Sequence, residues 1–239
     1  MMKRKHKRIK HETVTAYLMI APEVILMALF IFVPILYALY ISLFDWNAFG
    51  TKIFTGISNY IDVLRDSTFW DSLLITGKYA GIYVIAVYLL SLGAAVFVHS
   101  IRGNKRQQAV RIGIYLPNTI STIVAATLWT FLFNSRNGYI NKILEQLGIS
   151  RQLFLGSKTQ ALVCVAIVGI WIVFGYNMII FLSALKDVPA DYYEAAKIDG
   201  ANAVQRFFKI TFPLIKGTSI FILITTVISS FKYLIRLGS

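Results

Sequence analysis

The residues that could bind a solute are neutral polar and aromatic side chains inside long apolar stretches. Tyr79 and Tyr83 lie in one such stretch, Asn118 and Thr122 in a second, and Asn177 in a third. Aromatic rings can stack on the flat face of a solute, and amides and hydroxyls can hydrogen-bond to its polar groups, so these residues could line a translocation path. The same residue types also bond to helix carbonyls, anchor helices at interfaces and join helices. Both interpretations stay open at this stage.

Residues suited to catalysis or metal binding do not form a cluster in the sequence. The three histidines, His6, His11 and His99, stand apart among basic or apolar residues, and Cys164 is the single cysteine. A phosphate-binding loop of the form G-x-x-x-x-G-K-[ST] is absent. We therefore expect a protein that is not an enzyme, that holds no metal and that binds no cofactor itself.

The composition predicts that the polar residues named above lie on membrane-spanning helices. The chain has 239 residues, of which 57% are hydrophobic and 15% charged, and its mean hydropathy is +0.66. A helix needs about 20 apolar residues to cross the hydrocarbon core. Five such stretches predict an all-α, polytopic transmembrane bundle, with bends expected at Pro22 and Pro34 in the first. The predicted spans are 15–44, 72–100, 112–133, 160–185 and 218–234.

The net charge of +13 is explained by membrane topology rather than by nucleic acid. Residues 1–14 form a strongly basic N-terminus. With this end in the cytoplasm, the inner segments carry about fifteen basic residues and the outer loops about six. The bias predicts a cytoplasmic N-terminus and membrane lipid, not nucleic acid, as the partner of the basic clusters.

The loop between the fourth and fifth spans, at about 187–213, has the pattern of a structured element. Asp191 and Glu194 have capping-box spacing and predict the start of a helix. Gly200 predicts its end, because glycine readily adopts the left-handed conformation of a helix C-terminus. Asn202 and Gln205 repeat the capping-box spacing and predict a second helix that ends near Pro213.

A bent helix pair on the cytoplasmic face has a shape that another protein could grip. Val204, Phe207 and Phe208 share the i, i+3, i+4 spacing of one helical face, and the two phenylalanines could anchor the pair against the spans. Movement of the partner would then reach the spans as a rigid-body displacement. The alternative is an amphipathic helix that only lies on the lipid headgroups.

This segment carries a long, specifically spaced motif. Its residues are Glu194, Ala195, Ala196, Gly200, Ile210 and Pro213. The motif resembles the EAA loop in permease subunits of binding-protein-dependent ABC importers. The stretch 193–201 resembles the carbohydrate branch of that family, of the multiple-sugar, maltose and glycerol-phosphate type, and so do stretches 116–141 and 171–185. The resemblance covers nearly the whole chain.

The resemblance implies a type I ABC importer permease in a bacterial-type plasma membrane, importing a sugar or sugar-like solute. Its implied partners are a second permease subunit, cytoplasmic ABC ATPase subunits that hold ATP and Mg, and an extracytoplasmic solute-binding protein. The residues that the motif implies for coupling to the ATPase are Glu194, Ala195, Ala196, Asp199, Gly200 and Pro213.

The family has six spans, whereas this sequence carries five. We therefore expect residues 15–235 to form the permease domain and residues 236–239 to be a tail, with the sixth span absent. A different class of function, an ATPase-independent secondary transporter or channel, would be favoured by an inverted repeat or by buried charge. The sequence shows no convincing repeat and little charge inside the spans.

Overall fold

The structure, a computed structural model, describes residues 2–47 and 49–237. They fall into two compact units, one within residues 1–72 and one within 73–239. Helices dominate both units, which confirms the predicted all-α class. The elements that lie in the first unit or begin there are α1 (Met2–Met27), η1 (Ala28–Phe32), α2 (Val33–Ile41), β1 (Phe44–Asp45), β2 (Ile53–Phe54), α3 (Ser58–Arg65) and α4 (Ser67–Ser100).

The second unit contains most of α4 and all later elements. These are α5 (Asn104–Tyr115), η2 (Leu116–Thr119), α6 (Thr122–Leu132), α7 (Tyr139–Gln146), η3 (Phe154–Gly156), α8 (Lys158–Lys186), α9 (Ala190–Ile198), α10 (Ala203–Arg206), η4 (Phe207–Thr211), α11 (Phe212–Leu214) and α12 (Lys216–Leu237). Of the predicted tail, residues 236 and 237 belong to α12, and residues 238 and 239 lie outside the described part. The expected sixth span stays a prediction.

Apolar helices long enough to cross a membrane match most of the predicted spans. Among the described residues, three qualify as single helices, at 13–41, 67–100 and 158–186, and the number rises to five if each of two bent helix pairs is counted as one span. The first is an unbroken helical path through Pro22. Just before Pro34 it widens into the π-helical turn η1, in which the Val33 amide donates to the Ala28 carbonyl. The wider turn accommodates a proline that cannot donate a helical hydrogen bond.

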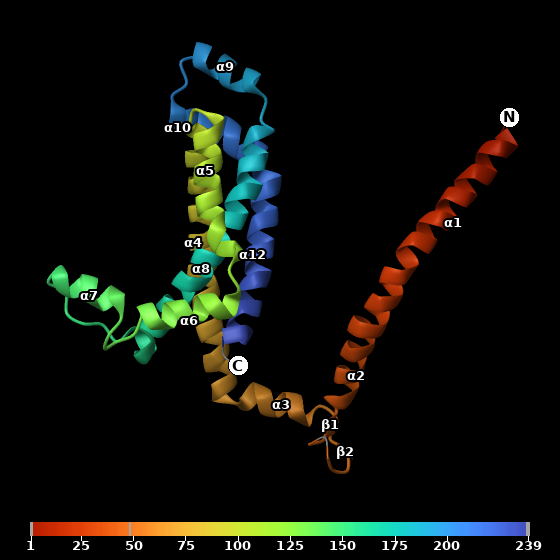
Figure 1. Cartoon of the computed structure of the whole chain (residues 1–239). Helices are drawn as coiled ribbons and strands as arrows, with labels where there is room; N and C mark the ends of the chain where they lie inside the picture. Colours follow the sequence, from red (N-terminus) through yellow and green to blue (C-terminus); the bar gives the residue numbers. More distant parts are fainter. Residues whose placement is uncertain (1, 48, 238–239) are drawn as a thin grey trace. The chain divides into compact units, whose positions relative to one another are not determined.

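The predicted third span is wrong as a single helix. The chain instead turns by 95° between residues 104–119 and 122–132. Pro117 lies in the 3-10 turn η2, and Ile120 and Ser121 have extended backbone with ψ of 136° and 138°. Two consecutive extended residues end one helix and start another, and a hydropathy average over the stretch does not detect them. Figure 1 shows α6 lying across the bundle that α5 runs along.

The core of the second unit is built around α8. In Figure 1, α4, α5, α8 and α12 run side by side. One buried cluster joins Leu92 of α4, Phe181 of α8 and Ile222 of α12, and a second joins Tyr79 and Tyr83 of α4 to Ala166 of α8. In addition, the Ser91 hydroxyl donates to the Phe174 carbonyl at 2.9 Å. This packing holds four helices in a fixed arrangement, and α9 and α10 are attached at one end.

Asn141, at the opposite end of the bundle from α9, is the centre of a buried hydrogen-bond network. Its side chain is 1% exposed. Its amide donates to the carbonyls of Ser135, at 3.2 Å, and Gln152, at 2.9 Å, and its oxygen accepts from the Gln152 backbone amide at 2.9 Å. These bonds tie α7 to the loop that leads into α8.

The substitution Asn141→Ala should therefore destabilise this end of the bundle. It leaves a buried backbone amide and two carbonyls without their partners, at a cost of about 1–3 kcal/mol. Thermal unfolding of the purified chain in detergent measures the effect. The exposed neighbour Asn137 offers a control, because Asn137→Ala should change stability by less than about 0.5 kcal/mol. Equal effects of the two changes would contradict the assigned role of Asn141.

Candidate functional site

Residues 187–213, which are predicted to couple the chain to an ATPase and are called the coupling segment below, begin with a helix whose start differs from the prediction. The N-cap of α9 is Pro189, with extended backbone (φ −59°, ψ 136°), and it makes no side-chain cap hydrogen bond. The predicted capping box of Asp191 and Glu194 is therefore wrong. Ala190 is already helical, so Asp191 lies in the first turn, where its charge complements the positive end of the helix dipole.

The end of α9 follows the prediction. Gly200 has a φ of +77°, in the left-handed region that glycine adopts without strain. The Gly200 amide donates to the Lys197 carbonyl at 3.1 Å, and the Ala201 amide donates to the Ala196 carbonyl at 2.8 Å. This pair of bonds is the Schellman motif, which satisfies carbonyls at the end of the helix and reverses the chain.

The second helix of the segment starts at the predicted capping box. The Gln205 backbone amide donates to Asn202 Oδ1 at 2.9 Å, and the Asn202 amide donates to Gln205 Oε1 at 2.9 Å. Because Gly200 and Asn202 are separated by one residue, the stop of α9 and the start of α10 form one tight corner. The spacing of these side chains was sufficient to predict it.

The predicted aromatic anchor is only half right. Phe207 packs against the core cluster, whereas Phe208 and Val204 are 63% and 64% exposed. The prediction assumed one regular helix through these residues. The chain instead enters the π-helical turn η4 at Phe207, and this wider turn changes the angle between successive side chains.

Pro213 follows the π turn in the same way that Pro34 follows η1. It lies in the first turn of the short helix α11. The chain then bends by 71° between residues 203–214 and 216–232. Pro213 thus lies at the junction of the coupling segment and the last apolar helix, where the direction of the chain changes.

The motif residues of α9 and of the turn that follows it are mostly exposed. Glu194, Ala195, Asp199 and Gly200 are exposed, whereas Ala196 is buried. Figure 1 shows α9 across one end of the bundle. The helix therefore presents Glu194 and Ala195 outward while Ala196 allows close approach to the chain beneath it.

Sequence reasoning missed one prominent residue of this surface. Ile198 is 87% exposed and lies one helical turn after Glu194, on the same side of α9. A large apolar side chain exposed beside a carboxylate suits a protein contact. The i, i+4 spacing of Glu194 and Ile198 is the feature of the sequence that could have indicated this residue.

The inner side of α9 is fixed to the bundle by a hydroxyl pair. Tyr193 Oη and Thr211 Oγ1 lie 2.9 Å apart, and Thr211 is 5% exposed. This bond links α9 to the π turn η4, from which the short helix α11 leads into the last apolar helix. It gives a physical route by which a displacement of α9 would reach that helix.

Two of the predicted path residues, Tyr79 and Tyr83, lie together in the interior. Both are fully buried, and their rings stack 5.5 Å apart with an interplanar angle of 17°. They pack on Gly169 of α8, where a Cβ would lie 3.0 Å from each tyrosine. Within this chain they fill the contact between α4 and α8.

The other predicted path residues lie in three elements: Asn118 in η2, Thr122 in α6 and Asn177 in α8. Asn118 Nδ2 donates to the Ile172 carbonyl at 3.3 Å, and Asn177 Nδ2 donates to Thr226 Oγ1 at 3.2 Å. The first bond joins η2 to α8, and the second joins α8 to α12. Thr122 begins α6 and is partly exposed. A role of these five residues in translocation stays a prediction.

Comparison with known proteins covers the coupling segment and most of the bundle. The profile of the family described as "Binding-protein-dependent transport system inner membrane component" matches residues 88–237. The sn-glycerol-3-phosphate transport system permease protein UgpA of Shigella flexneri is 35% identical over 217 residues, which cover 90% of this chain and 72% of that protein. The probable ABC transporter permease protein YesP of Bacillus subtilis is 35% identical over 233 residues, covering 95% and 74%.

Solved structures with the same fold belong to a bacterial importer of the acidic polysaccharide alginate. One crystal structure matches with a TM-score of 0.78 and 22% identity, covering 93% of this chain and 75% of the matched chain. A second, a complex with an alginate pentasaccharide-bound periplasmic protein, matches with a TM-score of 0.79 and 23% identity, covering 92% and 73%.

Proposed function

Because this chain belongs to the family of binding-protein-dependent transport system inner membrane components, we propose that it is the membrane-spanning permease subunit of an ATP-driven importer for a sugar or sugar-like solute. The resemblance derived from the sequence is thereby confirmed at the level of the family. The observation that carries the proposal is a single family match that includes both the bundle and the coupling segment. The relatives named for glycerol phosphate and the fold shared with an alginate importer support a solute of the carbohydrate type.

In this proposal the chain moves the solute and a partner hydrolyses ATP. The ATPase, with its ATP and Mg, contacts the outer surface of α9 at Glu194, Ala195 and Ile198. Its movement passes through the Tyr193–Thr211 contact and the bend at Pro213 to α12. A second permease completes the path, an extracytoplasmic binding protein delivers the solute, and the N-terminus faces the cytoplasm.

The substitution Glu194→Lys tests this assignment directly. Glu194 is exposed, so the change should leave the bundle folded while reversing a charge at the proposed contact. We expect the ATPase to be lost from a mild-detergent pull-down of the tagged chain from native membranes, and solute uptake to fall about tenfold or more, since breaking a charged contact costs about 2–5 kcal/mol. Binding of solute to the delivery protein should not change.

A matched control is available within the same segment. Asp187 is exposed directly after α8 and outside the motif, so Asp187→Lys makes the same charge change nearby. It should retain both the ATPase and uptake. If wild-type chain pulls down no ATPase yet still supports uptake, the protein is a secondary transporter or channel and the proposal fails.

A further inference from the structure

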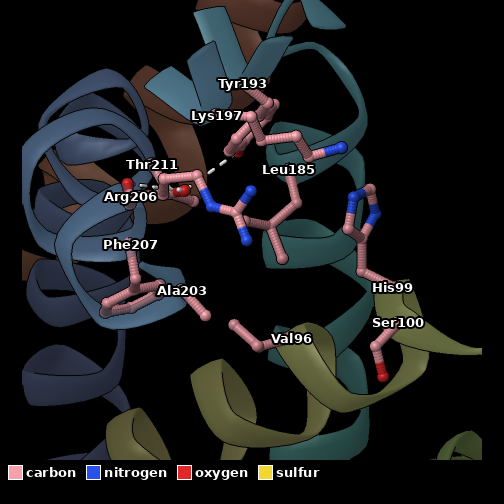
Figure 2. A pocket seen from close by; sticks show the side chains of 10 residues that line it. All are labelled: Val96, His99, Ser100, Leu185, Tyr193, Lys197, Ala203, Arg206, Phe207 and Thr211. Atoms are coloured by element: carbon pink, nitrogen blue, oxygen red, sulfur yellow. Dashed lines mark hydrogen bonds between the residues drawn. The ribbon is translucent and has the colours of Figure 1, made fainter. Parts of the chain in front are cut away.

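A pocket of about 510 Å³ lies behind α9, between the coupling segment and the ends of the apolar helices. Its walls come from the last turn of α4, the end of α8, the inner side of α9, and α10 with η4. Val96, Leu185 and Phe207 form an apolar part of the lining. Figure 2 shows the cavity opening between these side chains. Its size is within the range of small-molecule sites.

Three nitrogen-bearing side chains line the same pocket, and no acidic side chain does. They are His99 of α4, Lys197 of α9 and Arg206 of α10. In Figure 2 the guanidinium of Arg206 extends into the cavity, and the Lys197 ammonium and the His99 ring lie on its far side. Among the described residues none of the three makes an ion pair. The pocket is thus a site of uncompensated positive charge above an apolar floor.

We propose that this pocket binds the phosphate of an organic phosphate, supplied by an anionic phospholipid headgroup or by a soluble phosphate ester. A guanidinium donates two parallel hydrogen bonds to phosphate oxygens, an ammonium adds a point charge, and an imidazole N–H donates in either protonation state. Basic pockets between membrane helices on the cytoplasmic side commonly hold lipid headgroups. The apolar lining suits the glycerol and first acyl carbons.

The ligand would bridge two parts of the coupling machinery. His99 belongs to α4 in the bundle, whereas Lys197 and Arg206 belong to the coupling segment. A phosphate held by all three therefore stiffens the joint between them, and its occupancy regulates how well movement of α9 reaches the spans. This regulatory consequence rests on the proposed function, whereas binding itself does not.

Binding is tested with the full-length chain purified in mild detergent and radiolabelled dioleoylphosphatidylglycerol, with phosphatidylcholine of the same acyl chains as the comparison. The test variant is Lys197→Gln combined with Arg206→Gln. The control is Lys209→Gln combined with Lys216→Gln, because both of these lysines are exposed nearby and outside the pocket. Size-exclusion profiles establish that each variant is folded.

We expect the test variant to weaken phosphatidylglycerol binding about tenfold or more, and the control less than about twofold. Displacement of the lipid by millimolar inorganic phosphate would identify a soluble phosphate as the source, and resistance to it would identify the lipid headgroup. The inference would be overturned if the test and control variants lost phosphatidylglycerol binding equally. It would also be overturned if the wild-type chain showed no preference for phosphatidylglycerol over phosphatidylcholine and bound no inorganic phosphate. Glu194→Lys should leave phosphatidylglycerol binding unchanged. The test of the pocket and the test of the proposed ATPase coupling can therefore fail independently of each other.

Discussion

Replacing Gly200 with valine is expected to reduce coupled uptake strongly. Gly200 has a φ of +77°, and a β-branched residue held in that region is strained by about 1–3 kcal/mol. A Cβ at this position would meet no atom within 4 Å, so the effect comes from the backbone and not from a clash. Relief of the strain opens the Schellman turn and moves α9 relative to α10. Because every ~1.4 kcal/mol is a factor of ten, uptake should fall about tenfold or more.

Two further variants separate the turn from general destabilisation. Asparagine tolerates the left-handed conformation, so Gly200→Asn should keep most of the uptake and the associated ATPase. Gly103 has a φ of +95° outside the coupling segment, so Gly103→Val introduces similar strain elsewhere. Its uptake per folded molecule should stay near that of wild type. If Gly200→Asn is as inactive as Gly200→Val, the backbone argument is wrong.

Local chemistry explains which parts of the coupling segment could be predicted. The side chains of Asn202 and Gln205 each accept a hydrogen bond from the other residue's backbone amide, within four residues of chain. Gly200 ends α9 because its own backbone adopts a positive φ. Neither feature depends on distant packing. The predicted N-cap at Asp191 is wrong because Pro189, with its extended backbone, serves as the N-cap and starts the helix two positions earlier. The prediction that Phe208 anchors the helix pair is wrong because a π turn, which the sequence pattern does not indicate, replaces the regular helical repeat.

Tertiary packing explains what the sequence could not show. Apolar length predicts that residues 112–133 enter the membrane, but the break at Ile120 and Ser121 depends on where α6 finds its contacts. Tyr79 and Tyr83 have aromatic rings that could stack on a sugar in a translocation path. Within this chain, however, they fill the space beside Gly169, which has no side chain. The pocket around Arg206 collects side chains from five elements, so no spacing along the chain could indicate it.

The substitution Gly175→Ala is expected to destabilise the bundle more than any other glycine-to-alanine change in the spans. A Cβ on Gly175 would collide with the Ile114 carbonyl oxygen, and it would lie 2.9 Å from the Ile114 carbonyl carbon and 3.1 Å from Tyr115 Cα. These are backbone atoms of α5, which cannot move away by changing a rotamer. The whole of α5 must separate from α8 directly before the η2 turn.

Overpacking of this kind costs about 1–3 kcal/mol, and in a chain of this size it should lower the Tm by about 2–12 °C. Two glycines provide graded controls. A methyl group added at Gly113 of α5 would meet open space, so Gly113→Ala should leave Tm unchanged or raise it, because alanine favours helices. At Gly169 the neighbours are the side chains of Tyr79 and Tyr83, which can shift, so Gly169→Ala should give an intermediate loss. A Tm for Gly175→Ala equal to that of Gly113→Ala would show that α5 and α8 are not in contact at this point.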